Sequence, residues 1–222
     1  MTVRLRAAIV ALAAALLCGL LGSGVSEQPP AGIDLAGRAL AGEWPYVALV
    51  LTASCWWYSL VSLGIASIVL ALAVPAWRAR VIFALITTLV AWKASDVIKD
   101  VFARTRPEYW ILHHETSASY PSGHAMFAVV VYGLWSYYIA TSNLARPLRT
   151  VLAGIVALWG IGVIWSRLSL GAHYVTDLIG GVLFGIAMLA IAASITGVIP
   201  SPSTTLRTGS VEGPSPAATT RE

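Results

Sequence analysis

Charged side chains are scarce in this sequence. Of its 222 residues, 11% are Asp, Glu, Lys or Arg, whereas 58% are hydrophobic. A soluble globular domain carries about 25% charged residues, so this chain has too few of them to cover a water-facing surface. The composition excludes an ordinary soluble domain and indicates an integral membrane protein, although the length alone would suit one or two soluble domains.

Other features are missing as well. The sequence contains no Gly-rich nucleotide loop and no internal repeat. Its formal net charge of +4 is not accompanied by a basic face interleaved with aromatic residues, so nucleic acid is not expected as a partner. The two cysteines, Cys18 and Cys55, lie in apolar surroundings, and we expect them to be inert packing residues.

Long apolar runs are plentiful. A helix needs about 20 apolar residues to cross the hydrocarbon core of a bilayer. The segments that approach this length are 7–25, 47–73, 80–98, 123–141, 149–166 and 174–197. They predict an all-α, polytopic membrane protein built as a six-transmembrane-helix bundle. The first run, which follows a basic N-terminus, also resembles a signal peptide, but it is long for one and an uncleaved span is favoured.

The arginines predict the orientation of this bundle. They cluster before the first, third and fifth spans, at Arg4, Arg6, Arg78, Arg80, Arg146 and Arg149. Under the positive-inside rule that side is the cytoplasm. We therefore expect a plasma-membrane protein with both termini cytoplasmic. Residues 26–46, 99–122 and 167–173 then face the extracytoplasmic side.

Three regions follow from this pattern. Residues 1–45 form an N-terminal transmembrane helix and an external linker, with a short interfacial helix expected at 33–41. Residues 46–198 form the membrane core. Residues 199–222, rich in Pro, Ser and Thr, predict a disordered cytoplasmic tail.

Polar clusters stand at the external ends of the predicted spans, and ionisable residues at membrane depth usually mark functional sites. In the first cluster, "KDVFARTRP", Lys99 and Arg106 are placed to converge on one ligand from a helix end and the loop after it. Taken alone, this cluster also fits interface residues whose charged ends reach toward water. Arg104 and Tyr109, in the same stretch, are expected to be ordinary interfacial anchors, with a role in shaping substrate entry as the alternative.

The second cluster is "PSGH", at the start of an apolar run. Proline suits the first turn of a helix. The amides of Ser122 and Gly123 would then be free at the positive end of the helix dipole, which is a ready-made anion site. His124 would be a proton donor to that anion. A helix cap followed by a packed histidine explains the same residues equally well.

The third cluster, "SRLSLGAHYVTD", contains Arg167, His173 and Asp177. A four-residue spacing places His173 and Asp177 on one helical face. A carboxylate that accepts the Nδ1 hydrogen of a histidine turns the Nε2 lone pair outward, which makes a nucleophile or a base. A purely structural pair is the alternative, but burying Asp177 for structure alone would be costly. Three cations and a helix start together suit phosphate.

These motifs, taken in order, resemble the signature of the type-2 phosphatidate phosphatase superfamily, K-x6-R-P, then P-S-G-H, then S-R-x5-H-x3-D, and match it without a departure over roughly residues 45–197. The resemblance implies a catalytic core in which His173 attacks phosphorus to give a phosphohistidine, Asp177 holds its tautomer and His124 protonates the leaving group. The residues that it implies for phosphate binding are Lys99, Arg106, Ser122, Gly123 and Arg167.

The resemblance therefore implies a lipid phosphate or diphosphate phosphatase with its active site at the extracytoplasmic end, and with no metal or other cofactor. The expected substrate is a membrane lipid of the outer leaflet: an isoprenyl diphosphate such as undecaprenyl diphosphate, or a glycerophospholipid phosphate. Two alternatives stay open. One is a phosphotransferase that uses the same phosphohistidine, and the other is a non-catalytic protein that binds or transports lipid phosphates. The sequence does not settle the oligomeric state.

Overall fold

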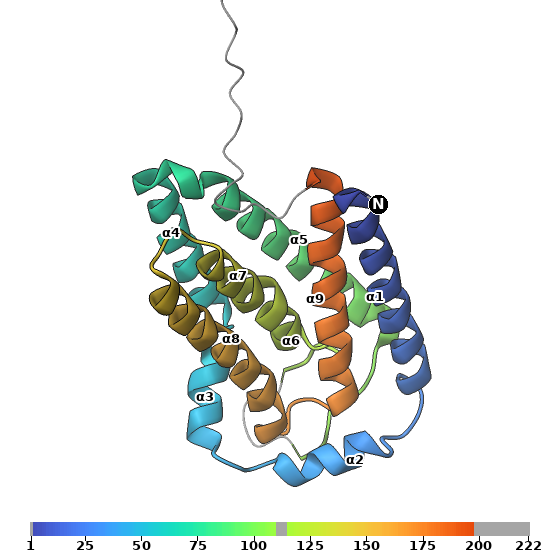
Figure 1. The fold of residues 1–222 in the computed structure, drawn as a ribbon. Helices are drawn as coiled ribbons and strands as arrows, with labels where there is room; N and C mark the ends of the chain where they lie inside the picture. Colours follow the sequence, from blue (N-terminus) through green and yellow to red (C-terminus); the bar gives the residue numbers. More distant parts are fainter. Residues whose placement is uncertain (1, 110–114, 198–222) are drawn as a thin grey trace, which may run out of the picture.

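The computed structural model describes residues 2–109 and 115–197. Helices are its only regular secondary structure, and no strand occurs among the described residues (Figure 1). The helices are α1 (Val3–Val25), α2 (Ile33–Gly37), η1 (Arg38–Leu40), α3 (Pro45–Ala53), α4 (Trp57–Ala73), η2 (Pro75–Trp77), α5 (Arg78–Phe102), α6 (Gly123–Phe127), η3 (Ala128–Gly133), α7 (Leu134–Ala140), α8 (Arg146–Ser169) and α9 (Val175–Thr196). The expected tail, 199–222, lies outside the described residues.

Within the described part of the chain, four helical stretches are long and apolar enough to cross a membrane: Val3–Val25, Pro75–Phe102, Arg146–Ser169 and Val175–Thr196. A fifth is counted if α3 and α4 form one span. Leucine, isoleucine and valine side chains on the outer faces of these helices are exposed, as expected for surfaces in contact with lipid. The all-helical membrane architecture is thus confirmed at this level.

The expected uninterrupted span over 47–73 is corrected by the structure. It consists of α3 and α4, which meet at an angle of 48°. At the break, Trp56 is extended and no longer helical. The carbonyl of Ala53, at the break, accepts the amide of Trp56 at 3.1 Å and also the hydroxyl of Ser59 at 2.8 Å. Such side-chain hydrogen bonds make a broken helix tolerable at membrane depth.

The segment that begins with the "PSGH" motif is helical from Gly123 to Ala140 but changes type along its length. It starts as α6, continues as the π-helical segment η3 and ends as α7. Ser122 is the N-cap of α6, and its hydroxyl accepts the amide of Ala125 at 3.4 Å. A π-helical turn changes which residues share a face, and such turns are frequent at functional sites.

Tyr120 locks the loop before α6 against α1 and α9, which lie side by side (Figure 1). Its side chain is fully buried, and its hydroxyl donates to the carbonyl of Cys18 at 2.6 Å. Gly22 and Gly180 make room for the ring, because a Cβ on either would collide with it. Small residues commonly allow such close approach between membrane helices.

The linker between α1 and α3 folds beneath the N-terminal end of α9 as α2 and η1, close to the expected short helix (Figure 1). The amide of Gly42 donates to the carbonyl of Ser169 at 2.8 Å, which fastens the linker to the end of α8. Asp34, in α2, is buried. The linker therefore belongs to the packed structure at this end of the bundle.

Replacing Gly22 by alanine should destabilise the protein. The new Cβ would lie 2.6 Å from the ring of Phe102 and 2.7 Å from that of Tyr120, and overpacking of this kind costs about 1–3 kcal/mol. Gly19→Ala is the matched control, because no atom lies within 4 Å of its added Cβ. We expect the Tm of the purified protein in detergent to fall for Gly22→Ala only. Equal values of Tm for the two variants would contradict this account of the packing.

Candidate active site

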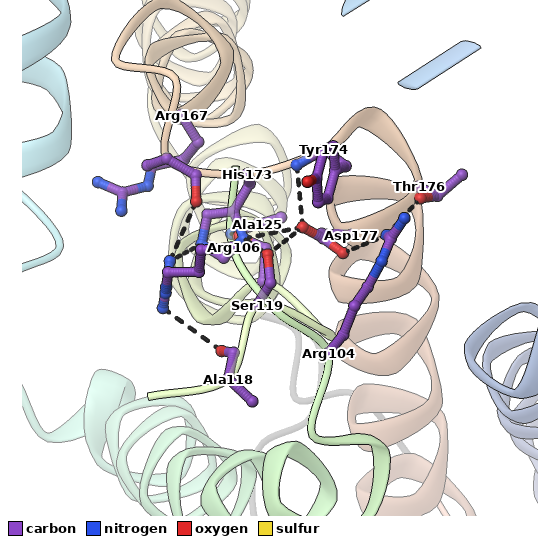
Figure 2. Close-up of polar contacts among 12 residues, drawn as sticks. Arg104, Arg106, Ala118, Ser119, Ala125, Arg167, His173, Tyr174, Thr176 and Asp177 are labelled. Carbon is purple, nitrogen blue, oxygen red and sulfur yellow. Dashed lines mark hydrogen bonds and ion pairs between the residues drawn. The ribbon is translucent and has the colours of Figure 1, made fainter. Parts of the chain in front are cut away.

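The three sequence clusters meet at one end of the bundle, where α5 and α8 end and α6 and α9 begin (Figure 1). Figure 2 shows His173 between the Arg106 side chain and the carboxylate of Asp177. His173, Asp177 and Arg167 are each at most 2% exposed. The structure thus brings together side chains that are far apart in the sequence.

The carboxylate of Asp177 accepts hydrogen bonds from several donors. Its Oδ2 lies 3.3 Å from Nδ1 of His173 and 2.9 Å from the amide of Tyr174, and it also accepts the hydroxyl of Ser119. Its Oδ1 accepts Nη1 of Arg104 at 2.6 Å. The predicted contact between His173 and Asp177 is present, but the two residues do not share a helical face, because His173 precedes Tyr174, the N-cap of α9. The capping contact to Tyr174 holds Asp177 in the first turn of α9.

The contacts of His173 determine its tautomer. Nη1 of Arg106 lies 3.1 Å from Nε2 of His173 (Figure 2). A guanidinium has donors only, so Nε2 must accept and the ring hydrogen must be on Nδ1, facing Asp177. Burial lowers the pKa of His173 well below its usual value, and the positive charges of Arg106 and Arg167 lower it further. The imidazole is therefore neutral, with its Nε2 lone pair directed at a cation.

Glu115 lies between two of the predicted phosphate-binding cations. Its Oε2 accepts Nη2 of Arg106 at 2.7 Å, and its Oε1 accepts Nη2 of Arg167 at 3.3 Å. Burial by itself raises the pKa of Glu115, but the positive charges of Arg167 and Arg106 outweigh burial and hold that pKa below its usual value. A carboxylate thus contacts the same guanidinium groups that an anionic ligand would use.

The remaining predicted cation, Lys99, lies beside this pair. Its Nζ donates to the hydroxyl of Ser117 at 3.2 Å, and the same hydroxyl accepts Nη2 of Arg106 at 3.1 Å. A cavity of about 470 Å³ opens here, between the end of α5 and the loop that starts at Glu115. The cavity is large enough for the polar part of a ligand whose anionic group lies on the arginines.

Arg167 reaches the site from α8, and α3 supports it. Its Nη1 donates to the hydroxyl of Thr52 at 2.6 Å. Thr52 is one residue from the end of α3, so the break between α3 and α4 lies close to the residue that holds this cation. The bent helix pair thereby contributes directly to the site.

His124 and Ser122 enter the site from the start of α6. Nε2 of His124 is buried and has no hydrogen-bond partner among the described residues, which suits a group that exchanges a proton with a ligand. The amide of Ser122 was expected to be free for an anion, but it has a partner within the protein. It donates to the carbonyl of Asp177 at 3.0 Å. This bond ties the start of α6 to the start of α9. The amide is thus not free for an anion.

Arg104 also corrects an expectation. It is no interfacial anchor, since only 3% of it is exposed and it pairs with two buried carboxylates. Three further residues of the site were not predicted: Asp34 contacts Arg104, Glu115 contacts Arg106 and Arg167, and Ser119 contacts Asp177. Their only sequence signal is polarity in an apolar chain, since each finds its main partners outside its own helix or turn.

The titratable side chains of the site do not form a metal centre. Among residues 2–109 and 115–197, no group of three or more His, Cys, Asp or Glu side chains is placed to hold a metal ion. The arrangement consists instead of a neutral histidine backed by a carboxylate, a second histidine, and several cations. It is suited to binding an anion and attacking it with a nitrogen nucleophile.

The comparisons with known proteins point to one family. A family model described as the PAP2 superfamily matches residues 77–199, more than half of the chain. Phosphatidylglycerophosphatase B of Bacillus subtilis is 35% identical over 98 residues, which are 42% of this chain and 47% of that protein. Phosphatidylglycerophosphatase B of Escherichia coli is 33% identical over 121 residues, 53% of this chain and 46% of that protein. The chain spans about half the length of these relatives.

A solved structure shows a similar fold. It is the crystal structure of a transmembrane PAP2 type phosphatidylglycerolphosphate phosphatase from Bacillus subtilis. The TM-score is 0.67 at 22% sequence identity, and the match covers 84% of this chain and 95% of that chain. At this identity the likeness is one of fold. The family resemblance predicted from the three motifs is confirmed by the family model.

Replacing Glu115 by glutamine should strengthen the binding of a phosphate-like anion. The substitution removes the negative charge that competes for Arg106 and Arg167, while keeping the size of the side chain. We expect the affinity for orthovanadate, measured by calorimetric titration, to rise by roughly 10-fold, which corresponds to one charge-assisted interaction.

The matched control for this experiment is Glu108→Gln, which removes the same charge from an exposed position in the same loop. It should leave the affinity within about 2-fold, because exposed charges are screened by salt. Weaker vanadate binding by Glu115→Gln would show that Glu115 supports the anion site instead of competing with it.

Proposed function

Because the chain belongs to the PAP2 superfamily, we propose that it is an integral-membrane lipid phosphatase that works through a phosphohistidine at His173. The observation that carries the proposal is the placement of His173, with Asp177 behind its Nδ1 and Arg106 at its Nε2. A histidine with this support is neutral and oriented for attack on an anion that binds the same arginine.

The reaction proceeds in two steps. In the first, Nη1 of Arg106 turns from Nε2 of His173 to a phosphoryl oxygen, the freed Nε2 lone pair forms a bond to phosphorus, and the bond from phosphorus to the lipid oxygen breaks. The leaving oxygen takes a proton from His124, whose protonated form a bound phosphate anion favours. In the second, water attacks the phosphohistidine, His124 takes a proton from that water, and inorganic phosphate leaves His173 free.

Lys99, Arg106 and Arg167 stabilise the charge that spreads over the phosphoryl oxygens, and preorganised cations of this kind supply much of the catalysis in phosphoryl transfer. Gly123 is the first residue of α6, so its amide is outside the hydrogen-bond ladder of that helix. We assign it to a phosphoryl oxygen. The Ser122 hydroxyl and amide hold the start of α6 in place. No metal or cofactor has a role in this mechanism.

The membrane arrangement is part of the proposal. Counting α3 with α4 and α6 with α7, the chain crosses the membrane six times. The first described residues and the end of α9 lie together at the end opposite the site (Figure 1). The starts of α1, α5 and α8 carry the clustered arginines, so this end faces the cytoplasm. Both termini are then cytoplasmic, and the active site faces outward across the plasma membrane.

The proposed substrate is a phosphorylated membrane lipid of the outer leaflet. Phosphatidylglycerol phosphate is favoured by the names of the two curated relatives, and an isoprenyl diphosphate suits the same anion site. In both, the apolar tail stays in the bilayer while the headgroup reaches the arginines. The cavity beside Lys99 would receive the part of the headgroup next to the reacting phosphate.

Phosphate release from a lipid panel tests this function. The panel contains phosphatidylglycerol phosphate, phosphatidate, diacylglycerol pyrophosphate and undecaprenyl diphosphate, presented to the purified protein in detergent with EDTA. We expect release that EDTA does not reduce and that His173→Ala abolishes, because no other group replaces the nucleophile.

The outcomes of the panel are distinct. Undiminished hydrolysis by His173→Ala would refute the assignment of the nucleophile. Appearance of phosphate on an added alcohol in place of water would identify a phosphotransferase. Binding without turnover by folded protein would identify a lipid-phosphate binding or transport protein.

The role of His124 can be tested through the leaving group. For a lipid alkyl phosphate, His124→Ala should lower kcat by roughly 10²- to 10⁴-fold, the usual contribution of a general acid. For p-nitrophenyl phosphate, whose leaving group needs no proton, the loss should stay below about 10-fold, provided that formation of the phosphohistidine limits the rate. Burst kinetics establish which step is limiting, and equal losses for both substrates would contradict the acid role.

A further inference from the structure

A chain of buried charges runs from the external linker to His173. Asp34, in α2, accepts Nη2 of Arg104 at 2.8 Å, and Nη1 of Arg104 donates to Oδ1 of Asp177 at 2.6 Å. Asp177 in turn contacts Nδ1 of His173. Each of these four residues is at most 3% exposed. The two carboxylates belong to helices that are far apart in the sequence.

Arg104 is held in one orientation from three sides. Its two terminal nitrogens contact different carboxylates. Nη1 also donates to the hydroxyl of Thr176 at 2.7 Å, and its guanidinium carbon lies 4.4 Å from the centre of the Tyr174 ring. Figure 2 shows Arg104 extending past Asp177 to Thr176. A planar guanidinium with fixed donors restricts where the Oδ1 atom of Asp177 can lie.

Asp34 anchors the far side of Arg104 and also the start of α9. Its Oδ1 accepts the amide of Thr176 at 2.9 Å, and its carboxylate accepts the Thr176 hydroxyl as well. The amide of Thr176 lies in the first turn of α9, where amides have no partner within the helix. Asp34 therefore contacts both the guanidinium and the helix that carries Asp177.

The cations proposed to bind phosphate have other polar partners besides this chain of buried charges. Arg106 and Arg167 contact Glu115, and Lys99 contacts Ser117. Among the described residues, the guanidinium of Arg104 joins Asp34 to the carboxylate of Asp177, and Asp177 in turn contacts His173. Partners that orient the ligands of metal sites typically contribute 10- to 100-fold to affinity or activity, and we expect an effect of the same size here.

We propose that Arg104 and Asp34 are positioning residues that fix the carboxylate of Asp177 so that it orients His173, which makes the linker between α1 and α3 a functional part of the active site. This inference rests on the proposed function. It predicts that loss of either residue slows the chemical step and leaves the affinity for a phosphate-like anion nearly unchanged.

The test is a pair of double-mutant cycles on the full chain with the best lipid substrate. Arg104→Met and Asp34→Asn are each made in the wild-type and in the Asp177→Asn background. In the wild-type background we expect kcat to fall by roughly 10- to 100-fold, with orthovanadate affinity within about 3-fold of wild type. In the Asp177→Asn background each further substitution should cost less than about 3-fold, because residues that act through one group are not additive.

Two sets of variants separate positioning from general destabilisation. Arg38→Met removes an exposed arginine from the same linker and should leave kcat unchanged. Arg104→Lys keeps the charge but loses the two-pronged contact, so its kcat should lie between those of wild type and Arg104→Met. If Arg104→Met does not give folded protein by size-exclusion chromatography, the cycles of Asp34→Asn and Arg104→Lys decide the question.

The possible failures are distinguishable. Equal fold-losses in both backgrounds, or a loss of vanadate affinity that parallels the loss of kcat, would overturn the positioning role alone. A wild-type protein without hydrolysis, or an active His173→Ala variant, would overturn the proposed function and this inference with it.

Discussion

Asp177 places a carboxylate where water does not reach, and the surrounding structure must supply the hydrogen bonds that water would otherwise provide. Burying a charge costs several kcal/mol unless it is paired and fully hydrogen-bonded. The donors come from separate parts of the chain: Ser119 from the loop before α6, Tyr174 from the start of α9, and Arg104 from the segment after α5. These segments must therefore meet at one point, which is where His173, the proposed nucleophile, lies.

The packing of the helices brings these donor segments together around Asp177. Tyr120 directly follows Ser119, and its ring fills the space that Gly22 and Gly180 leave between α1 and α9. The amide of Ser122 then ties the start of α6 to the carbonyl of Asp177. The loop that carries the Ser119 donor and the helix that carries His124 are thus positioned by the same few contacts. Small residues in the membrane helices are in this way connected to the geometry of the site.

Much of the fold and part of the site could be predicted from the sequence, and the division has a physical basis. Apolar length predicted the helices, and the spacing from His173 to Asp177 predicted their contact, because both depend on residues close in sequence. The break after Ala53 was not predicted, since the run remains apolar through it. Asp34 was missed because its partner Arg104 is 70 residues away. A contact between residues this far apart produces no spacing pattern by which a single sequence could reveal it.

The charge cluster also has an order of assembly. Asp34 lies near the beginning of the chain, Arg104 in its middle and Asp177 in the last described helix. During synthesis from the N-terminus, Arg104 can therefore meet a first carboxylate well before the second emerges from the ribosome. The Arg104 guanidinium can therefore pair with the carboxylate of Asp34 before Asp177 is present. Insertion of α9 then delivers Asp177 to an arginine that is already held, so His173, the proposed nucleophile, is oriented only once α9 is in place.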